Sequence, residues 1–350
     1  MSVVVGAELV TPRGATLAEN VFFLRAGVRT TSPSPFVDAD GEPLRVQYCP
    51  WLGAALPLSE RLPRLVSAAL RGVGPALPGD DRAVALHLVL DERVGADVVA
   101  ALEALARESV ARRTLRPAVV HRGAAGAFAA LSAIDGDLAD PAIGAAILVA
   151  VDSFLDEARL AEALLVPSPW ARRAPSPSEG VAALILTDRD TARAHLRPVL
   201  AEVLHSATTV GEPGDDNDLP VDGWATTALL HGLAQQTAPI VAAFGQSAVD
   251  ALRTQEWMYS AARTKERFSA YYQKLCLESA VGLLGAASGA ASLAFLVGVA
   301  RHEAFDVPSG EAGNLLAWAI SSDRTRGLAL LAVPDAAFRD AALGGGFDGA

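Results

Sequence analysis

Cysteine and histidine are the side chains best able to do nucleophilic or metal chemistry, and this sequence has few of them. Its 350 residues include two cysteines, Cys49 and Cys276, too few for a disulfide framework and compatible with a reducing compartment. Cys49 follows an expected edge strand at residues 45–48, and Cys276 lies in an apolar run. A reactive thiolate needs an electropositive, partly exposed setting, so we predict two buried structural thiols.

The histidines and the main acidic cluster lack the spacing of a metal site. No pair of histidines follows the His-x-x-x-His pattern, and Asp215-Asp216-Asn217-Asp218 does not keep the register of a calcium loop. We therefore predict no metal and no cofactor, and a solvated loop at residues 215–218. The six histidines are His87, His121, His195, His205, His231 and His302.

The composition limits the class of protein. The chain is 51% hydrophobic but only 6% aromatic, with a formal net charge of −11. So many apolar residues exclude a disordered chain, and the acidic excess argues against binding nucleic acid or an anionic membrane. Because Ala, Leu and Val supply most of the apolar content, we expect a core of closely approaching helices and strands.

One segment has the length of a membrane span. Residues 279–300 carry no charge and could cross a bilayer, and they contain regularly placed small residues. Ala, Gly and Ser, however, contribute little transfer free energy, and a helix that is apolar all round also suits the interior of a large soluble protein. We predict a buried core helix here. The first residues lack the basic and apolar regions of a secretory signal, so we expect a cytoplasmic protein.

Strands and helices alternate along the chain. In the first half we expect strands at residues 2–5, 83–90, 118–121, 145–151 and 181–186, and helices at 15–26, 58–70, 96–112, 124–134 and 156–165. In the second half we expect strands at 199–205, 248–252, 275–278, 315–320 and 328–333, and helices at 224–236, at 257–273 and from 285 onward. Aromatic residues gather at 256–272, where they suit either an interface or the core.

The two halves resemble each other. Ser178-Glu179-Gly180 leads into one apolar strand, and Thr325-Arg326-Gly327 leads into another, each after an Ala-rich helix. Two βαβαβ halves with Ala-rich central helices predict an α/β fold, a five-layer αβαβα sandwich, divided at residues 1–190 and 191–350. Helices clamped between two sheets have no room for large side chains, which explains the composition.

This layout resembles the thiolase superfamily, in particular its β-ketoacyl synthase (ketosynthase) branch. The opening strand with Val-Thr-Pro-Arg-Gly is similar to the family's "G-x-V-T-P-x-G" turn, and Glu179-Gly180-Val181 is similar to its "E-G-A-A-A-L" strand. The stretch at 285–292, Gly-Ala-Ala-Ser-Gly-Ala-Ala-Ser, resembles the helix that follows the family's second catalytic histidine. The resemblance therefore implies the thiolase-like sandwich and covers most of the chain.

The resemblance also implies a cysteine nucleophile, two histidines, a lysine and a Gly-rich oxyanion loop, and none of them is present. Ala124 takes the place of the cysteine, Leu283 that of the "G-H-T" histidine and Glu278 that of the lysine. Residues 252–257 replace the first histidine's loop, and residues 321–327 replace "G-F-G-G-T-N". We predict no catalytic residue. The candidates for a remnant pocket are His121, Arg122, Ser321 and Arg324, with Arg326 as a further surface cation.

Three functions remain open from the sequence. The first is a catalytically inactive ketosynthase-like subunit that binds or scaffolds, similar either to chain-length factors or to shortened thiolase-like proteins associated with type VI secretion effector clusters. The second is an active 3-oxoacyl-acyl-carrier-protein synthase or acyltransferase with displaced residues. The third is a degraded fold that binds a carrier protein or acyl chain without turnover. We expect a homodimer, or a heterodimer with a ketosynthase-like partner, paired through the strand at 118–121, because pairing covers an apolar edge.

Overall fold

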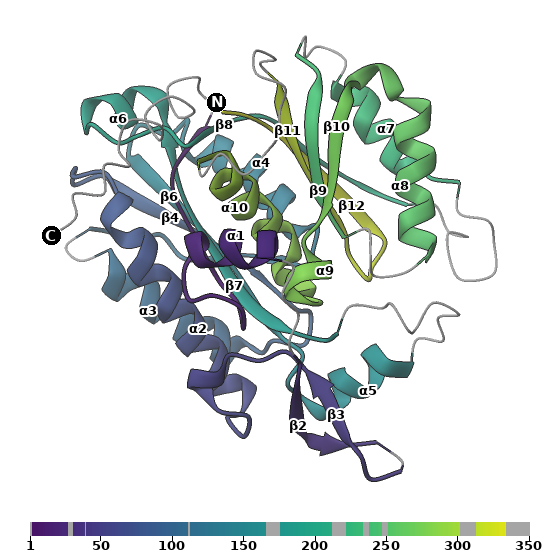
Figure 1. The fold of residues 1–350 in the computed structure, drawn as a ribbon. Helices are drawn as coiled ribbons and strands as arrows, with labels where there is room; N and C mark the ends of the chain where they lie inside the picture. Colours follow the sequence, from purple (N-terminus) through teal and green to yellow (C-terminus); the bar gives the residue numbers. More distant parts are fainter. Residues whose placement is uncertain are drawn as a thin grey trace, which may run out of the picture.

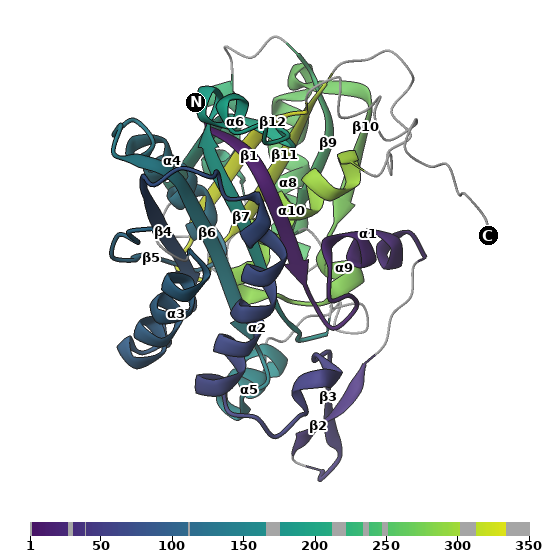
Figure 2. The same cartoon turned by 90° about the vertical axis from the view of Figure 1, so that its left-hand side faces the viewer.

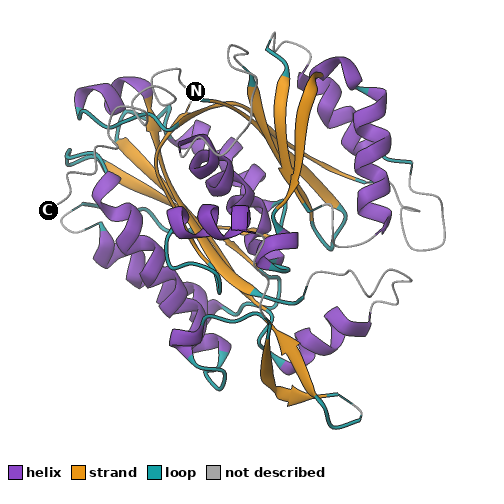
Figure 3. Cartoon of the chain, viewed as in Figure 1, coloured by secondary structure: helices purple, strands orange, loops and turns teal. Residues whose placement is uncertain are grey.

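The computed structural model describes residues 2–26, 31–38, 40–110, 113–165, 176–211, 222–233, 238–246, 251–301 and 313–333. Its main sheet has ten strands in the order β10-β9-β11-β12-β8-β1-β7-β6-β4-β5. The two central strands, β1 and β8, meet through only two residue pairs, Val3 with Glu202 and Val4 with Ala201. The sheet therefore consists of two five-stranded halves joined at one corner (Figures 1 and 3).

The first sheet half has the order β1-β7-β6-β4-β5, with β4 parallel to both β5 and β6, and β7 antiparallel to its neighbours. Its outer face is covered by α2 and α3, whose apolar residues pack against alternate residues of the strands (Figure 2). The elements are β1 (Ser2–Val10), α2 (Leu58–Val73), β4 (Ala83–Leu90), α3 (Ala96–Ser109), β5 (Val119–Arg122), β6 (Ile143–Ser153) and β7 (Glu179–Asp188).

The second sheet half repeats this order as β8-β12-β11-β9-β10, again with three parallel strands at the outer end. Helices α7 and α8 cover its outer face, where Trp257 stacks on Trp318 with ring centroids 4.6 Å apart. The elements are β8 (Ala201–Val210), α7 (Trp224–Gly232), β9 (Ile240–Gly245), α8 (Ala251–Arg263), β10 (Phe268–Cys276), β11 (Asn314–Ile320) and β12 (Thr325–Ala332).

A layer of helices lies between the two sheet halves (Figure 1). Its core contains residues of both halves, and small residues let the helices approach closely: a Cβ on Gly289 would lie only 2.2 Å from the Ala124 carbonyl oxygen. Residues Ser288 to Ala300 are all buried, as predicted, and no helix among the described residues is long and apolar enough to span a membrane. The layer comprises α1 (Leu17–Ala26), α4 (Gly126–Asp137), α9 (Glu278–Val281), the 3-10 turn η6 (Gly285–Ala287) and α10 (Ser288–Arg301).

A smaller unit projects from one end of the molecule (Figure 2). The hairpin of β2 and β3 forms a separate two-stranded sheet, and Val46 of β3 packs against Leu155 and Leu160. Its elements are β2 (Ser32–Val37), β3 (Pro43–Val46), the turn η1 (Pro50–Leu52) and α5 (Glu157–Leu165). The short elements elsewhere are η2 (Gly74–Ala76), α6 (Arg189–Ala194) and η5 (Lys265–Arg267).

The main error of the sequence prediction falls between residues 240 and 278. The strand expected at 248–252 is wrong, because β9 lies at 240–245 and residues 251 and 252 belong to α8. The helix expected at 257–273 ends at Arg263, and residues 268–276 form β10. Glu278 starts α9 and does not end a strand. The other expected elements are present, most of them with shifted ends, and β1 continues to Val10, beyond its expected end at residue 5. The cluster at 215–218 lies outside the described residues.

Candidate functional site

The candidate site lies where the parallel strands of both sheet halves end and the buried helices begin. β5 leads into the turn before α4, and β11 ends at Ile320, next to Ser321. α10 passes against the same turn, since Gly289 fits beside the Ala124 carbonyl. Open α/β sheets bind ligands at the carboxyl ends of their strands, so this is the end where chemistry is expected.

The turn before α4 contains no nucleophilic side chain. Gly123 has φ +69°, a left-handed conformation that suits glycine, and the buried Ala124 and Ala125 follow it. The Ala125 N–H donates to the Ser321 hydroxyl at 2.8 Å, and a Cβ on Gly123 would lie 2.6 Å from that oxygen. Ser321, in the turn after β11, therefore bonds the N–H at the start of α4. The side chains of the turn before α4, Ala124 and Ala125, are only methyl groups.

His121 turns away from this point and joins a hydrogen-bonded chain. Its Nε2 lies 3.1 Å from Nδ1 of His87 on β4, and His87 Nε2 lies 2.8 Å from Oδ2 of Asp137, the last residue of α4. Burial lowers the pKa of His87, and burial with the neighbouring His87 lowers the pKa of His121 to about 4. With both rings neutral near pH 7, His87 donates to the Asp137 carboxylate and accepts from His121.

The arginine candidates differ in the contacts that they make. Arg122 is exposed, and its guanidinium donates to the carbonyl oxygens of Asp91 and Val94 at 2.6 and 3.4 Å. Arg324 lies in the turn between β11 and β12 with φ +67°, and its carbonyl accepts from Arg326. Arg326 is buried, not solvated as expected, and its guanidinium holds both carboxylate oxygens of Glu256 at 3.1 Å. Of the four candidates, Ser321 bonds to the start of α4.

The start of α10 contains a buried carboxylate that sequence reasoning did not single out. Asp152, at the end of β6, accepts hydrogen bonds from the N–H groups of Ser153 and Ala286, both at 2.8 Å. Gly285 has φ +53°, and a Cβ there would collide with the Asp152 carboxylate. Asp152 thus supplies an acceptor, and a negative charge, to the turn that opens α10.

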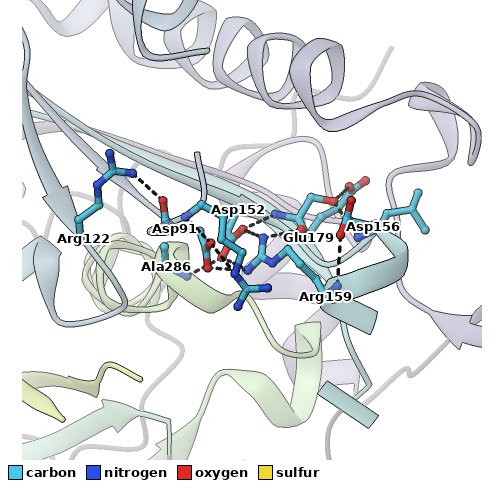
Figure 4. Close-up of polar contacts among 10 residues, drawn as sticks. Asp91, Arg122, Asp152, Asp156, Arg159, Glu179 and Ala286 are labelled. Carbon is cyan, nitrogen blue, oxygen red and sulfur yellow. Dashed lines mark hydrogen bonds and ion pairs between the residues drawn. The ribbon is translucent and has the colours of Figure 1, made fainter. Parts of the chain in front are cut away.

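Arg159 of α5 balances that charge (Figure 4). Its Nη2 lies 2.8 Å from Asp152 Oδ2 and 3.1 Å from Asp91 Oδ2, while its Nη1 bonds the other Asp152 oxygen and the Ser153 carbonyl. The guanidinium also lies 4.6 Å from the centre of the Phe154 ring. The side chains of Asp152 and Arg159 are 0% and 6% exposed, so this is a buried ion pair that joins β6, α5 and the loop after β4.

A second buried pair lies beside it. Arg61 of α2 and Glu179 of β7 are both 0% exposed, and Arg61 Nη1 lies 2.9 and 3.1 Å from the two Glu179 oxygens. Glu179 also accepts from the Cys49 N–H and the Ser153 hydroxyl, each at 2.7 Å. Burial, and then the Glu179 charge, raises the pKa of the Cys49 thiol well above its usual range. Cys49 is therefore a buried thiol, as predicted, whereas Cys276 is only half-buried.

The positions compared with the second histidine and the lysine hold a half-buried leucine and a buried glutamate. Leu283 is half-buried, and its backbone bonds Ser176 and Ser178 at 2.9 and 3.0 Å, which ties the loop before α10 to the loop before β7. Glu278 is 2% exposed and begins α9. Among the described residues, no three His, Cys, Asp or Glu side chains are grouped as a metal site.

Two signals in the sequence could have revealed the buried charges. Arg61 stands on the apolar face of α2, four residues before Leu65, so its side chain has to enter the core. Asp152 is the next-to-last residue of a strand that is otherwise apolar on both faces. Buried charges of this kind need a partner, which each of them has.

The sequence matches no protein-family model and no curated protein. Solved structures do match over 95% of this chain. The ishigamide ketosynthase/chain length factor shares 22% identity over 99% of that chain, with a TM-score of 0.69. The ketosynthase from module 6 of the bacillaene synthase from Bacillus subtilis 168 shares 12% identity over 72% of that chain, with a TM-score of 0.74. A third match is AntDE:AntF, a type II polyketide synthase acyl-carrier protein in complex with its ketosynthase bound to the hexaketide. It shares 13% identity over 99% of that chain, with a TM-score of 0.75.

These matches establish the architecture. The chain has the mixed α/β, thiolase-like fold of the ketosynthases, and the predicted fold class is confirmed. At identities of 12–22% they show the fold and leave the activity to be argued from the site.

Proposed function

We propose that this protein is a catalytically inactive ketosynthase-like subunit that acts by binding a partner. The observation that carries the proposal is the turn before α4. There the resembled family has its nucleophilic cysteine, and this chain has Ala124, a residue that is 5% exposed. An acyl group cannot be transferred from a thioester to a methyl group, so the first step of condensation has no nucleophile at this position to accept the acyl group.

The corrected position of β9 extends the same argument to the first histidine. Ala242-Ala243-Phe244-Gly245 stands where the family's "E-A-H-G" would run, so Phe244 takes the histidine's place. Its ring is fully buried, with its centroid 5.1 Å from that of Phe295. With Phe244 and Leu283 at the two histidine positions, no imidazole is available there to stabilise an enolate.

The alternative is an active synthase or acyltransferase with displaced residues, and two observations weigh against it. The Cys49 thiol is buried with a raised pKa beside a carboxylate, the opposite of an activated nucleophile. His121 is hydrogen-bonded to His87 and directed toward Asp137, so it does not serve as a base at the α4 turn.

The edge strand β5 is the surface we propose for subunit pairing. It lies at the end of the strand order with β4 as its neighbour, and Val119 on it is 46% exposed. Pairing through an edge strand would cover its free backbone groups, in a homodimer or in a heterodimer with a ketosynthase-like chain. The match to a structure described as a ketosynthase/chain length factor favours the heterodimer version. An acyl-carrier protein and a secretion effector are further partners under the same proposal.

A turnover assay tests the proposal. The purified protein is incubated with acyl- and malonyl-coenzyme A, or with the acyl-carrier-protein thioesters, and release of free thiol is followed against buffer alone. We expect no release above buffer, and a stable complex with a co-expressed partner on size-exclusion chromatography. Catalytic release that is lost in Cys49→Ser or Cys276→Ser would contradict the proposal and support the active enzyme.

A further inference from the structure

The two central helices begin close together and both are supplied with an oxygen atom by the protein itself. The first N–H groups of a helix have no partner within the helix, and a buried helix start therefore attracts an oxygen or an anion. The starts of α4 and α10 belong to one site, because Gly289 of α10 fits against the Ala124 carbonyl.

At α4 the oxygen is the Ser321 hydroxyl. It accepts from the Ala125 N–H at 2.8 Å, and Ser321 is 4% exposed. Its own backbone is fixed in the turn, where the Ser321 N–H donates to the Thr325 carbonyl and its carbonyl accepts from the Arg324 N–H. The absence of a Cβ at Gly123 makes room for the hydroxyl, since a Cβ would approach it to 2.6 Å.

In η6, the turn that leads into α10, the oxygen is Oδ2 of Asp152. It accepts from the Ala286 N–H at 2.8 Å, and the glycine at 285 makes room for it. Arg159 holds this carboxylate in place from α5 and is itself tied to Asp91. Each helix start is thus paired with an oxygen whose position is fixed by further bonds and by a neighbouring glycine.

We propose that Ser321 and Asp152 form an internal plug, two protein oxygens that occupy the places where a ligand's carbonyl or anionic oxygen would bind at the starts of α4 and α10. The inference rests on the proposed function, because it concerns the same site, and it adds a reason why that site stays closed. A thioester carbonyl could reach the Ala125 N–H only if the Ser321 hydroxyl moved away.

A cysteine placed at the turn makes the plug measurable. In Ala124→Cys the new thiol lies beside a helix start that Ser321 already occupies, whereas in Ala124→Cys with Ser321→Gly the N–H is free to stabilise the thiolate. The probe is iodoacetamide: the thiol loses its proton to solvent, a sulfur–carbon bond forms, the carbon–iodine bond breaks and iodide leaves. Peptide mass spectrometry separates labelling of position 124 from that of Cys49 and Cys276.

We expect labelling at position 124 to be at least about ten-fold faster in Ala124→Cys with Ser321→Gly than in Ala124→Cys alone, since a thiolate near free helix N–H groups is stabilised. Ala124→Cys with Ser322→Gly is the matched control, because Ser322 is exposed in the same turn, and its rate should equal that of Ala124→Cys alone. Ala124→Cys with Ser321→Ala keeps the turn backbone and should also label faster. Equal rates in all four proteins, or equal acceleration by the Ser322 change, would overturn the plug.

This result is independent of the turnover assay on the unmodified protein. Thiol release by the natural chain would refute the proposed function, whereas the labelling rates would still test the Ser321 contact. Equal labelling rates together with no turnover would refute the plug and would still agree with the proposed inactive subunit.

Discussion

The two halves of the molecule use the same buried ion pair with the charges exchanged. Glu179 precedes Gly180 at the start of β7 and pairs with Arg61 of the outer helix α2. Arg326 precedes Gly327 in the equivalent place on β12 and pairs with Glu256 of the outer helix α8. Each half thus has a buried ion pair between this strand and the outer layer, with the opposite sign of charge on the strand.

The surroundings of the two pairs differ. Glu179 also binds the Cys49 N–H and the Ser153 hydroxyl, which link it to the hairpin and to the plug region, whereas Glu256 binds Thr226 of α7. The first pair thus connects four parts of its half, and the second connects the strand to the outer helices α7 and α8 and to the turn at Arg324. We therefore expect the loss of the first pair to lower the free energy of unfolding more than the loss of the second.

Glu179→Gln is expected to be the most damaging change. It leaves the Arg61 guanidinium buried without its counter-charge, which costs about 3–5 kcal/mol of unfolding free energy for a buried pair. Urea unfolding followed by circular dichroism measures the loss. Arg64→Met is the matched control, because Arg64 is on the same helix but exposed, and it should change stability by less than about 0.5 kcal/mol. A loss under about 1 kcal/mol for Glu179→Gln would refute the role given to the pair.

Glu256→Gln should cost about 3 kcal/mol, at the lower end of the same range, because fewer elements depend on Glu256. The same urea series measures it. Combined with Glu179→Gln, the two losses should add within about 0.5 kcal/mol, since they lie in separate sheet halves with no shared partner. A clear departure from additivity would show that the halves are coupled through the joining strands.

The glycines after the paired residues provide a sharper comparison. A Cβ on Gly327 would lie 2.5 Å from Cδ2 of Phe128, a ring held within the middle layer, while a Cβ on Gly180 would lie 3.0 Å from the flexible end of Leu284 and 3.1 Å from the Val10 carbonyl. We expect Gly327→Ala to cost about 2–3 kcal/mol and Gly180→Ala about 1 kcal/mol by overpacking. Thermal unfolding measures both, and the opposite order would contradict this packing.

The histidine chain has no counterpart among the described residues of the second half, so its contribution to the pH dependence of stability arises in the first half. His121 stays neutral in the fold down to a pKa of about 4, whereas an unfolded histidine binds a proton near 6.5. Between these values the unfolded chain holds more protons, so this contribution is complete above pH 6.5 and is lost as the pH falls toward 4, by about 1–2 kcal/mol.

Urea midpoints at pH 7.5, 6, 5 and 4.5 test this dependence. His121→Gln should flatten it, and His231→Gln, which changes an exposed histidine of α7, should leave it unchanged. If His121→Gln keeps the full pH dependence, another group is responsible.

The sequence predicted the repeat and the layers well, because both depend on patterns that survive in a single chain. Apolar runs such as Ala83–Leu90 mark strands covered on two faces, and Ala-rich segments mark helices between sheets. It failed at β9 and β10 for physical reasons. A six-residue strand buried on both faces has no periodicity, and the aromatic residues of β10 fall at spacings that also suit a helix.

For the site, the family resemblance led us to predict Ala124 at the nucleophile position and to name Ser321, but it did not predict the charges around them. Asp152, Arg159 and Glu179 come from β6, α5 and β7, and only the fold brings them together. His121 and Arg122 are next to the turn in sequence, yet their side chains are held by His87 and by the carbonyls after β4. Adjacency in sequence did not predict where a side chain points.

Intact-mass spectrometry after incubation with acyl-coenzyme A and acyl-carrier-protein thioesters tests the central claim most directly. We expect an unchanged protein mass, because Ala124 cannot carry an acyl group and Cys49 is buried with a raised pKa. An acyl adduct on the natural chain, lost on replacing Cys49 or Cys276, would contradict it.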